Sequence, residues 1–495
     1  MSGNEQATTV GQLPTPTSTK SRVATTLTRL VWLLWATSLG ALAVRLWTGS
    51  GWKLAGLVAV DGLTAVMGTA VTFFSGIVHS YSKRYMAGNE TVDQFFARVF
   101  AFTLVVMVLV AADSLVLFGI AWLAMGLVMA SLIGHVDGWP QAQAAAAVAR
   151  RYFLASSALL AVALGTLWWT TGATTVSGVA GAVGTLSTPA VVFAAGALLL
   201  SAMLQSALVP FHTWLLSSMT APTPASALMH AGFVNAGGIL LVRFAPVVTV
   251  EPGVMLVIVL VGATSALLGK LLKSVQTDVK GTLGCSTVGQ MGFMIMQAGL
   301  GFFGAAITHL ILHGCYKAYQ FLSSGSRVAH ESPTETETTA APGLAGVAVI
   351  ALTALAAGGL FAVLTGKGTK LGGGLLLVGL VVLTVLHAAR EVVTRTQLPA
   401  TLRYAAVPLI ALPAVAVYAA VYRVIEGLVA DLPAVGYTAE LTPIHALVAV
   451  GFLAAYLAVE SGVYQHSQRL YVALLNATTA PTDTLLTSTE DYNEY

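Results

Sequence analysis

The chain has 495 residues, of which 56% are hydrophobic and only 9% are charged, and its formal net charge is +3. Soluble globular domains carry about 25% charged residues, so this composition excludes a water-soluble protein. No basic cluster of the kind that binds nucleic acid is present. The two cysteines, Cys285 and Cys315, lie in apolar segments, which argues against a disulfide framework and against a zinc site with four ligands from this chain. We therefore expect no metal or other cofactor.

Apolar stretches of about 20 residues recur along the chain, and each is long enough to cross a bilayer. Backbone polar groups in lipid need internal partners, so the spans form either helices or a closed barrel. The stretches do not alternate with period two, which favours helices. The sequence therefore predicts an all-α integral membrane protein with about 14 transmembrane helices. The predicted spans are 28–48, 54–78, 98–112, 114–134, 152–172, 188–208, 224–244, 253–270, 282–299, 302–325, 342–365, 371–389, 401–425 and 441–460.

Both ends of the chain are polar, and we predict a disordered tail at 1–27 and another at 477–495. One polytopic membrane domain, 28–476, lies between them. Its last part, 462–476, is expected to be a surface helix, and the polar stretch 328–341 is expected to link two membrane halves.

The distribution of lysine and arginine predicts the orientation, because cytoplasmic loops carry an excess of these residues. A cytoplasmic N-terminus and an even number of spans put most of them on the cytoplasmic side. The opposite side then receives only Lys53, Arg243, Lys367, Lys370 and Arg423. We expect a multi-pass protein of the cell membrane with both termini in the cytoplasm.

The segment from Gln205 to Arg243 contains three prolines, Pro210, Pro222 and Pro224, in an otherwise apolar stretch. Proline breaks a helix, and irregular backbone at membrane depth is tolerated where protein buries it or water reaches it. Broken helices of this kind point to ion paths in transporters. The polar residues beside the break are Gln205, His212, Thr213, His230 and Asn235. The alternative is a kinked helix with histidines that bond only to backbone.

A second group, His309, His313 and Lys317, has the spacing i, i+4, i+8, which places all three on one face of a helix. Ionisable residues inside a membrane are by default candidates for function, and histidine titrates near neutral pH. Stacked about 6 Å apart, such groups can relay protons through water. The alternative is a lysine that extends to the membrane interface.

A third group lies in 276–297, where Lys280 stands at a cytoplasmic helix entrance and several polar residues follow within the helix. The alternative is helix capping by Thr277 or Asp278 with close helix packing. Asp113 is a weaker candidate, since it begins a span and can simply cap it. No Gly-rich phosphate loop in a strand–turn–helix setting and no nucleophile triad can be argued. The chain alone is not expected to be an enzyme.

Five motifs follow one another in the first two thirds of the chain. They are HSYSKRYM at 79–86, PFHTWL at 210–215, APTPASALMHA at 221–231, DVK at 278–280 and HGCYK at 313–317. Together they resemble the proton-conducting antiporter-like family, which includes respiratory complex I subunit L and the large Mrp antiporter subunits. The resemblance covers about 79–326 and implies an antiporter-like fold with a discontinuous, proline-broken helix.

Two departures indicate a particular branch. Complex I subunits have a glutamate where this chain has Leu123, and a lysine where it has Gln205. With HAGFVNAGG at 230–238, the chain resembles the DabB branch, the membrane subunits of DabA–DabB inorganic-carbon pumps. That resemblance implies conduction of H⁺, or of Na⁺, coupled to CO₂ capture and hydration by a zinc-containing, carbonic-anhydrase-like DabA partner.

The predicted path uses His230 and Lys317 as titrating relay groups, with His309 and His313 between them. Lys280 would serve the cytoplasmic entrance, and Gln205 would hold water where relatives hold lysine. His212 and Asp113 complete the candidate set. Two other functions stay open: a subunit of an NADH-quinone oxidoreductase or Mrp-type antiporter, with Asp113 compensating for the missing carboxylate, and a membrane anchor for an enzyme.

Overall fold

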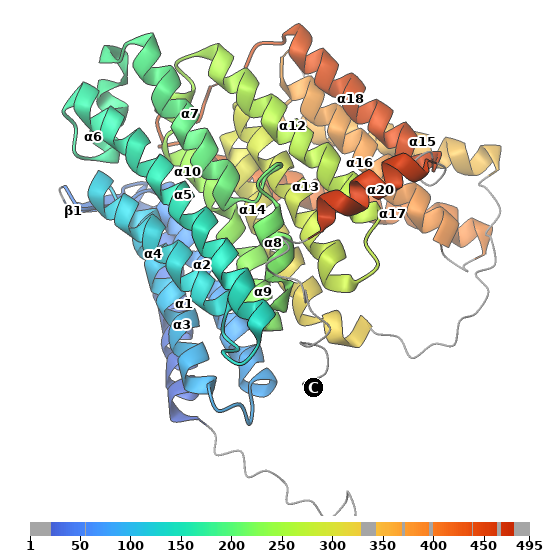
Figure 1. Ribbon diagram of the computed structural model, residues 1–495. Helices are drawn as coiled ribbons and strands as arrows, with labels where there is room; N and C mark the ends of the chain where they lie inside the picture. The colour runs from blue at the N-terminus through green and yellow to red at the C-terminus, as the bar shows by residue number, and fades with distance from the viewer. Residues whose placement is uncertain are drawn as a thin grey trace, which may run out of the picture.

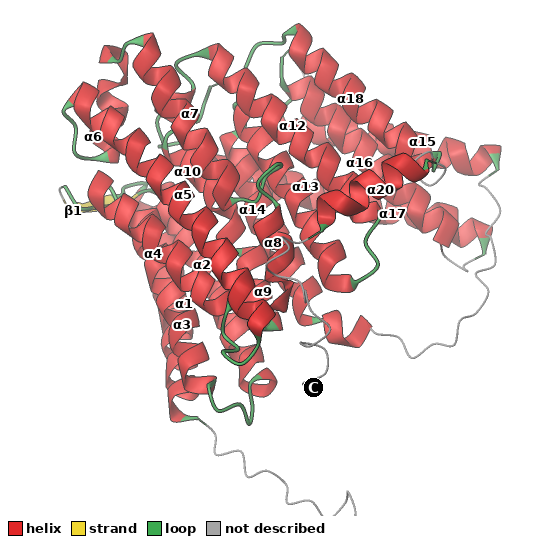
Figure 2. Cartoon of the chain, in the orientation of Figure 1, coloured by secondary structure: helices red, strands yellow, loops and turns green. Residues whose placement is uncertain are grey.

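The computed structural model describes residues 21–54, 56–327, 343–368, 372–395, 399–437, 439–462 and 467–479. Within these ranges the chain is a bundle of helices with one short β-hairpin, β1–β2 (Figures 1 and 2). Eleven of the described helical segments are long and apolar enough to cross a membrane, with Thr223–Arg243 counted as one of them. The other three predicted spans, 282–299, 302–325 and 441–460, correspond to α13, α14 and α18. Each of the 14 predicted spans therefore corresponds to a helical segment.

The elements of the amino-terminal part are α1 (Arg22–Thr48), β1 (Trp52–Leu54), β2 (Val58–Val60), α2 (Gly62–Tyr85), α3 (Val92–Ala111), α4 (Leu115–Ile133), α5 (Pro140–Thr171), α6 (Val176–Ala182), η2 (Val183–Thr185), α7 (Thr188–Gln205), α8 (Thr213–Ser217) and η3 (Ser218–Thr220). They are followed by α9 (Thr223–Ala231), η4 (Phe233–Asn235), α10 (Ala236–Arg243), α11 (Ala245–Val248), α12 (Pro252–Ser274), α13 (Val279–Gly299), α14 (Phe303–Leu322), η5 (Ser324–Arg327), α15 (Leu344–Thr365), α16 (Gly374–Arg395), α17 (Ala400–Leu428), α18 (Pro443–Glu460) and α20 (Gln468–Thr478).

The ends of the membrane domain differ from the prediction. α1 begins at Arg22, so the last six residues of the predicted tail 1–27 are helical. The physical reason is a cap, since the Ser21 hydroxyl accepts a hydrogen bond from the Ala24 amide at 2.9 Å. The predicted surface helix is α20, which continues to Thr478. Residues 1–20, the linker 328–341 and residues 480–495 lie outside the described ranges.

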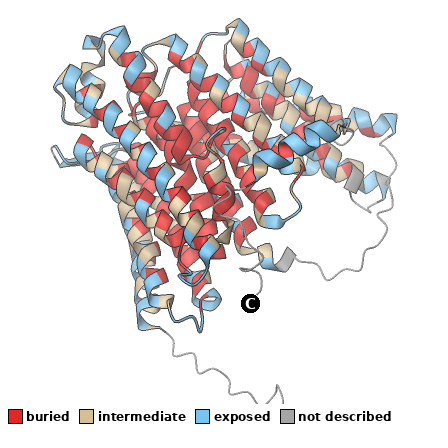
Figure 3. Cartoon of the chain, viewed as in Figure 1, coloured by how far each residue is buried: buried red, intermediate tan, exposed pale blue. Residues whose placement is uncertain are grey.

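Burial separates the centre of the bundle from its lipid-facing rim (Figure 3). In the most apolar window of Thr223–Arg243, 94% of the residues are buried, whereas in the corresponding windows of α1 and α17 only 11% are buried. Large apolar side chains are exposed on the rim helices, as expected of a surface that faces lipid. Trp47, Trp168 and Trp169 are exposed near the ends of α1 and α5, in the manner of an aromatic belt.

Small residues let the central helices approach each other closely. A Cβ added at Gly262 of α12 would lie 2.4 Å from the Met296 backbone nitrogen of α13. A Cβ at Gly314 of α14 would lie 2.8 Å from the Ala231 carbonyl oxygen of α9. The first contact holds α13 against α12, and the second holds α14 against the broken helix.

A buried ion pair holds the far end of the broken helix. Arg243, the last residue of α10, pairs with Asp61, the N-cap of α2. The Arg243 guanidinium also donates to the Val110 carbonyl oxygen at 2.7 Å and to the Thr64 hydroxyl at 3.1 Å. Burial raises the pKa of Asp61, but the Arg243 charge and the hydrogen bonds from Arg243 and Thr64 outweigh it and hold the pKa below its ordinary value.

Candidate functional site

The predicted discontinuous helix is present, but its breaks do not all lie at the prolines. α7 ends at Gln205, and Pro222 and Pro224 stand at the N-cap and in the first turn of α9, where proline is well tolerated. The second interruption follows Gly232, where the chain passes through η4 into α10. The Asn235 side-chain amide donates to the Ala231 carbonyl oxygen at 2.7 Å, which satisfies a carbonyl freed by the break.

His230 lies in α9 with none of its surface exposed. Its Nδ1 is 2.9 Å from the Thr287 hydroxyl oxygen, and that hydroxyl donates to the Leu283 carbonyl oxygen at 2.9 Å. Because the hydroxyl hydrogen is used there, Nδ1 carries the hydrogen and donates to Thr287. Nε2 is then the acceptor nitrogen, and it is buried with no hydrogen-bond partner among the described residues. His230 is therefore held in one tautomer with a free site for a proton.

Lys317 is fully buried on α14, and its Nζ donates to the Leu283 carbonyl oxygen at 2.9 Å. The same oxygen accepts the bond from Thr287, so one turn of α13 holds Lys317 and the His230 partner together. His230 lies within Coulombic range of Lys317, and its ring stacks on Phe321 with centroids 4.3 Å apart. Among the described residues the partner of the Lys317 ammonium is a carbonyl oxygen and not a carboxylate, which makes Lys317 a candidate functional residue.

His309, His313 and Lys317 form one face of α14, named here the His–Lys face. The rings of His309 and His313 are nearly parallel, 12° apart, with centroids 5.6 Å apart. Both nitrogens of His313 and Nε2 of His309 are buried without a hydrogen-bond partner in the described part of the chain. His313 lies within Coulombic range of His309, Lys317 and His230. The structure thus brings four of the predicted path residues together.

The remaining predicted residues are placed differently. Lys280 donates from Nζ to the Met219 and Ala221 carbonyl oxygens, at 3.1 and 3.0 Å, and so holds the turn that precedes α9. Gln205 is fully buried at the end of α7, and neither atom of its amide has a partner among the described residues. His212 donates from Nε2 to the Ala477 carbonyl oxygen at 2.9 Å, which ties α20 to the start of α8.

Asp113 is not brought to this site, contrary to the prediction. Its two carboxylate oxygens accept hydrogen bonds from the backbone amide and the hydroxyl of Ser177, both at 2.8 Å. The Asp113 carbonyl oxygen also accepts from the Val176 amide at 2.6 Å. The carboxylate therefore anchors the first turn of α6, because amides at a helix start lack partners within the helix.

Comparison with known proteins identifies the family of this chain. The family described as "NADH:quinone oxidoreductase/Mrp antiporter, TM" matches residues 112–367, and the amino-terminal region of complex I chain 5 matches residues 48–96. The chain belongs to the NADH:quinone oxidoreductase/Mrp antiporter family. It is a multi-pass membrane protein, and the predicted resemblance is confirmed at the level of the family.

Among curated members of this family, a protein named "Probable inorganic carbon transporter subunit DabB1" from Halothiobacillus neapolitanus is 41% identical over 284 residues, 56% of this chain and 50% of that protein. The "Probable inorganic carbon transporter subunit DabB" of Hydrogenovibrio crunogenus is 37% identical over 55% of this chain and 53% of its own. NADH-quinone oxidoreductase subunit L of Mycobacterium tuberculosis is 37% identical over 54% of this chain and 43% of its own. The chain spans about half the length of the curated relatives it matches.

The fold is also similar to a solved structure of the Mrp complex from Dietzia sp. DQ12-45-1b, with a TM-score of 0.55 and 22% identity. That match covers 92% of this chain and 52% of the other. The predicted antiporter-like fold is confirmed.

Within this family member, sequence reasoning missed how the site is connected. Thr287 is one of several polar residues in α13, and the spacing of these residues alone does not show which of them contacts His230. His79 was noted only as part of a motif. It is buried, its Nδ1 lies 2.8 Å from the Ser75 carbonyl oxygen, and its Nε2 has no partner among the described residues. No group of three or more His, Cys, Asp or Glu residues suited to a metal ion occurs within the described ranges.

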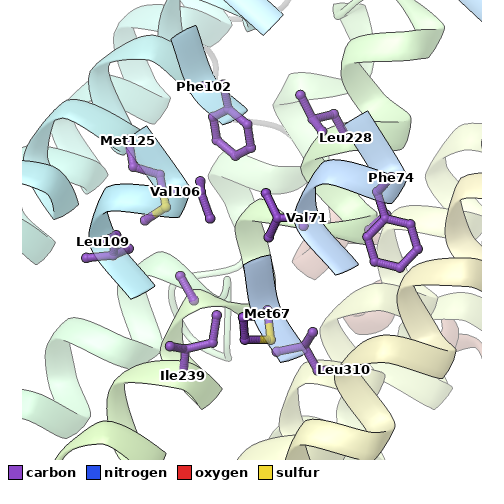
Figure 4. Close-up of a pocket in the computed structure, with 13 residues that line it drawn as sticks. Met67, Val71, Phe74, Phe102, Val106, Leu109, Met125, Leu228, Ile239 and Leu310 are labelled. Atoms are coloured by element: carbon purple, nitrogen blue, oxygen red, sulfur yellow. The ribbon is translucent and has the colours of Figure 1, made fainter. Parts of the chain in front are cut away.

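A small apolar cavity of about 20 Å³ lies beside the break in the helix (Figure 4). Its lining comes from α2, α3, α4, α9, α10 and α14, and includes Met67, Phe74, Phe102, Leu228 and Ile239. A cavity of this size is about as large as one water molecule, and its lining is almost entirely apolar. The cavity therefore offers little to hold water, whereas the polar groups brought together with Lys317 lie on α9, α13 and α14.

Proposed function

We propose that this chain is the cation-conducting membrane subunit of an energy-coupled inorganic-carbon pump, and that the cation is H⁺. In this proposal a zinc-containing, carbonic-anhydrase-like partner of the DabA type hydrates CO₂, and the chain itself carries out no covalent chemistry. The observation that carries the proposal is the connected group of His230, Thr287 and Lys317, continued by the His–Lys face. The DabB names of the relatives supply the substrate class.

The geometry supports a relay in which one set of groups positions the side chains and another set carries the proton. The Leu283 carbonyl oxygen cannot carry a proton onward, so its role is to position Lys317 Nζ and the Thr287 hydroxyl. The proton would pass between Lys317, His313 and His230 through water at the unpartnered nitrogens of the two histidines, since a water bridge is nearly as favourable as a direct hydrogen bond. We assign cytoplasmic termini and the cell membrane to this chain on the basis of the lysine and arginine distribution.

Uptake measurements on Lys317→Ala test the proposal. We expect uncoupler-sensitive inorganic-carbon uptake to fall by about a hundredfold, because a positioned proton-transfer group is removed. Lys53→Ala is the matched control, since Lys53 is an exposed lysine in β1. Its uptake should stay at the wild-type level. Unchanged uptake in Lys317→Ala would remove Lys317 from the path and favour a membrane anchor instead.

A second function has specific support. The match to the Mrp complex and to subunit L favours a subunit of an antiporter or of an NADH-quinone oxidoreductase. Purification of the complex from native membranes separates the two functions. A large zinc-containing partner supports the inorganic-carbon pump, whereas co-purification of NADH dehydrogenase or of other Mrp subunits would contradict it.

A further inference from the structure

The His–Lys face ends at His309, short of the other end of α14. About 20 Å of helix separates Lys317 from Gly304 at the start of α14. At Gly304 the helix meets α17, where an added Cβ would lie 3.3 Å from the Glu426 Cα. This close approach brings a second set of polar side chains to the end of α14 that is opposite Lys317.

These side chains are Tyr418, Tyr422 and Glu426, named here the Tyr–Glu face. Their spacing i, i+4, i+8 repeats on α17 the spacing of the His–Lys face on α14. The Tyr422 hydroxyl donates to Glu426 Oε1 at 2.7 Å. Lys367, just after the end of α15, places Nζ 3.0 Å from the same oxygen. One oxygen of the Glu426 carboxylate thus contacts both the hydroxyl of a buried tyrosine and the ammonium of a lysine.

Exposure increases along the Tyr–Glu face. Tyr422 is 1% exposed, whereas the Glu426 and Lys367 side chains are 29% and 22% exposed. The Lys367 ammonium also lies over the rings of Phe302 and Tyr422, 5.3 and 5.9 Å from their centroids. A charged pair in this setting lies at the boundary between the protein interior and the outside, where a proton can leave.

Gln297 of α13 lies between the two faces. Its side chain is fully buried and lies close to the Tyr418 hydroxyl, but its amide atoms make no hydrogen bond of ordinary geometry among the described residues. One turn earlier on α13, the Phe293 ring lies 5.3 Å from the His309 ring. An amide accepts and donates hydrogen bonds, so Gln297 can orient water between His309 and Tyr418.

We propose that Gln297 and the Tyr–Glu face form the second half of the proton path, from His309 to the membrane face opposite Lys317, with Glu426 as the terminal proton-transfer group. This inference rests on the proposed function. Each hydroxyl passes its own proton forward as it receives one from behind, and the Glu426 carboxylate accepts a proton from Tyr422 and then releases it to solvent. Lys367 keeps the carboxylate in place. No electron moves and no other bond is formed.

Flux measurements on the complete purified complex, in vesicles that enclose a pH-sensitive dye, test the inference. Glu426→Gln should lower the H⁺ flux by about tenfold or more, since the terminal proton-transfer group is lost. Tyr422→Phe keeps the ring but removes the hydroxyl, and should also lower the flux. Glu440→Gln is the control, because Glu440 is an exposed carboxylate away from this face, and its flux should match the wild type.

Lys367→Met separates a relay from an ion pair that only joins α15 to α17. Both Lys367→Met and Glu426→Gln break the pair, so an equal loss of flux in the two variants would overturn the inference. A much larger loss in Glu426→Gln supports it. If Glu426→Gln fails to assemble, Tyr422→Phe decides by its flux at an unchanged thermal midpoint.

Two further outcomes separate this inference from the proposed function. Wild-type flux in Glu426→Gln and Tyr422→Phe, with loss in Lys317→Ala, would overturn the second half of the path alone. Absence of H⁺ flux in the wild-type complex would overturn both.

Discussion

Two buried cations beside the broken helix have very different surroundings. Arg243, at the far end of α10, has the Asp61 carboxylate, the Thr64 hydroxyl and the Val110 carbonyl oxygen as partners. Lys317, beside α9, has the Leu283 carbonyl oxygen, and Nε2 of His230 and both ring nitrogens of His313 lack partners among the described residues. A charge paired with a carboxylate has a structural role, because removal of the carboxylate would leave it uncompensated. A buried charge with unsatisfied neighbours leaves room for water and for a change of protonation.

The largest expected effect is on the stability provided by the Arg243–Asp61 pair. Asp61→Asn leaves the Arg243 charge buried without its carboxylate, and we expect a loss of about 3–5 kcal/mol in the free energy of unfolding. Thermal unfolding of the purified protein in detergent measures it. Loss of H⁺ flux at full stability would show that this pair conducts, and would break the contrast between the two cations.

Low pH should weaken the Arg243–Asp61 pair in the wild type and so lower its stability. The folded-state pKa of Asp61 is lowered, so its contribution is fully present above the ordinary aspartate pKa of about 4 and is lost as the pH falls through the lowered value. The unfolding midpoint of the wild type should therefore fall more steeply than that of Asp61→Asn below about pH 4. Parallel profiles would contradict this assignment.

An intermediate effect is expected at the connection between α13 and α9. Thr287→Val removes the hydroxyl that fixes His230 in one tautomer, and we expect the H⁺ flux to fall by about tenfold with little change in stability. Thr308→Val is a matched control, because Thr308 is also buried and its hydroxyl bonds to the Gly304 carbonyl oxygen. Equal flux in both variants would show that the tautomer of His230 does not matter.

The smallest effect is expected at Asp113. Asp113→Ala removes the carboxylate that accepts hydrogen bonds from Ser177 in the first turn of α6, and should cost about 1 kcal/mol of stability without changing the flux. Ser177→Ala should cost a similar amount, and the double variant should cost less than the sum, since both residues belong to one contact. A loss of flux at unchanged stability would instead support the alternative in which Asp113 replaces the missing family glutamate.

Hydropathy and spacing predicted a large part of this molecule. Lipid imposes long apolar helices, so each predicted span corresponds to a helical segment, and the spacing of His309, His313 and Lys317 gave their shared face. The start of α1 was missed because one hydroxyl, that of Ser21, extends the helix beyond the apolar stretch. The break after Gly232 was missed because proline marks a helix start as readily as an interruption.

The partners of the site residues were not predictable, because they depend on how helices pack. Lys280 was placed at a cytoplasmic entrance, yet its contacts are two backbone carbonyl oxygens. Thr287 contacts His230 because α13 packs beside α9, and the sequence does not reveal that packing. Glu426 and Lys367 come from a region in which the sequence shows no family motif. Their pairing joins α17 to the residues just after α15, and such a contact leaves no periodic pattern in the sequence. In this protein, motifs indicate the family, and packing indicates which charges are satisfied.

The most direct test of the account is the H⁺ flux of Lys317→Met in vesicles, measured with the complete complex and compared with its thermal midpoint. The account predicts that flux falls to the background of empty vesicles while the midpoint stays near that of the wild type, because Lys317 is a relay group with few partners to lose. Wild-type flux would contradict the account, and so would a loss of flux fully explained by unfolding.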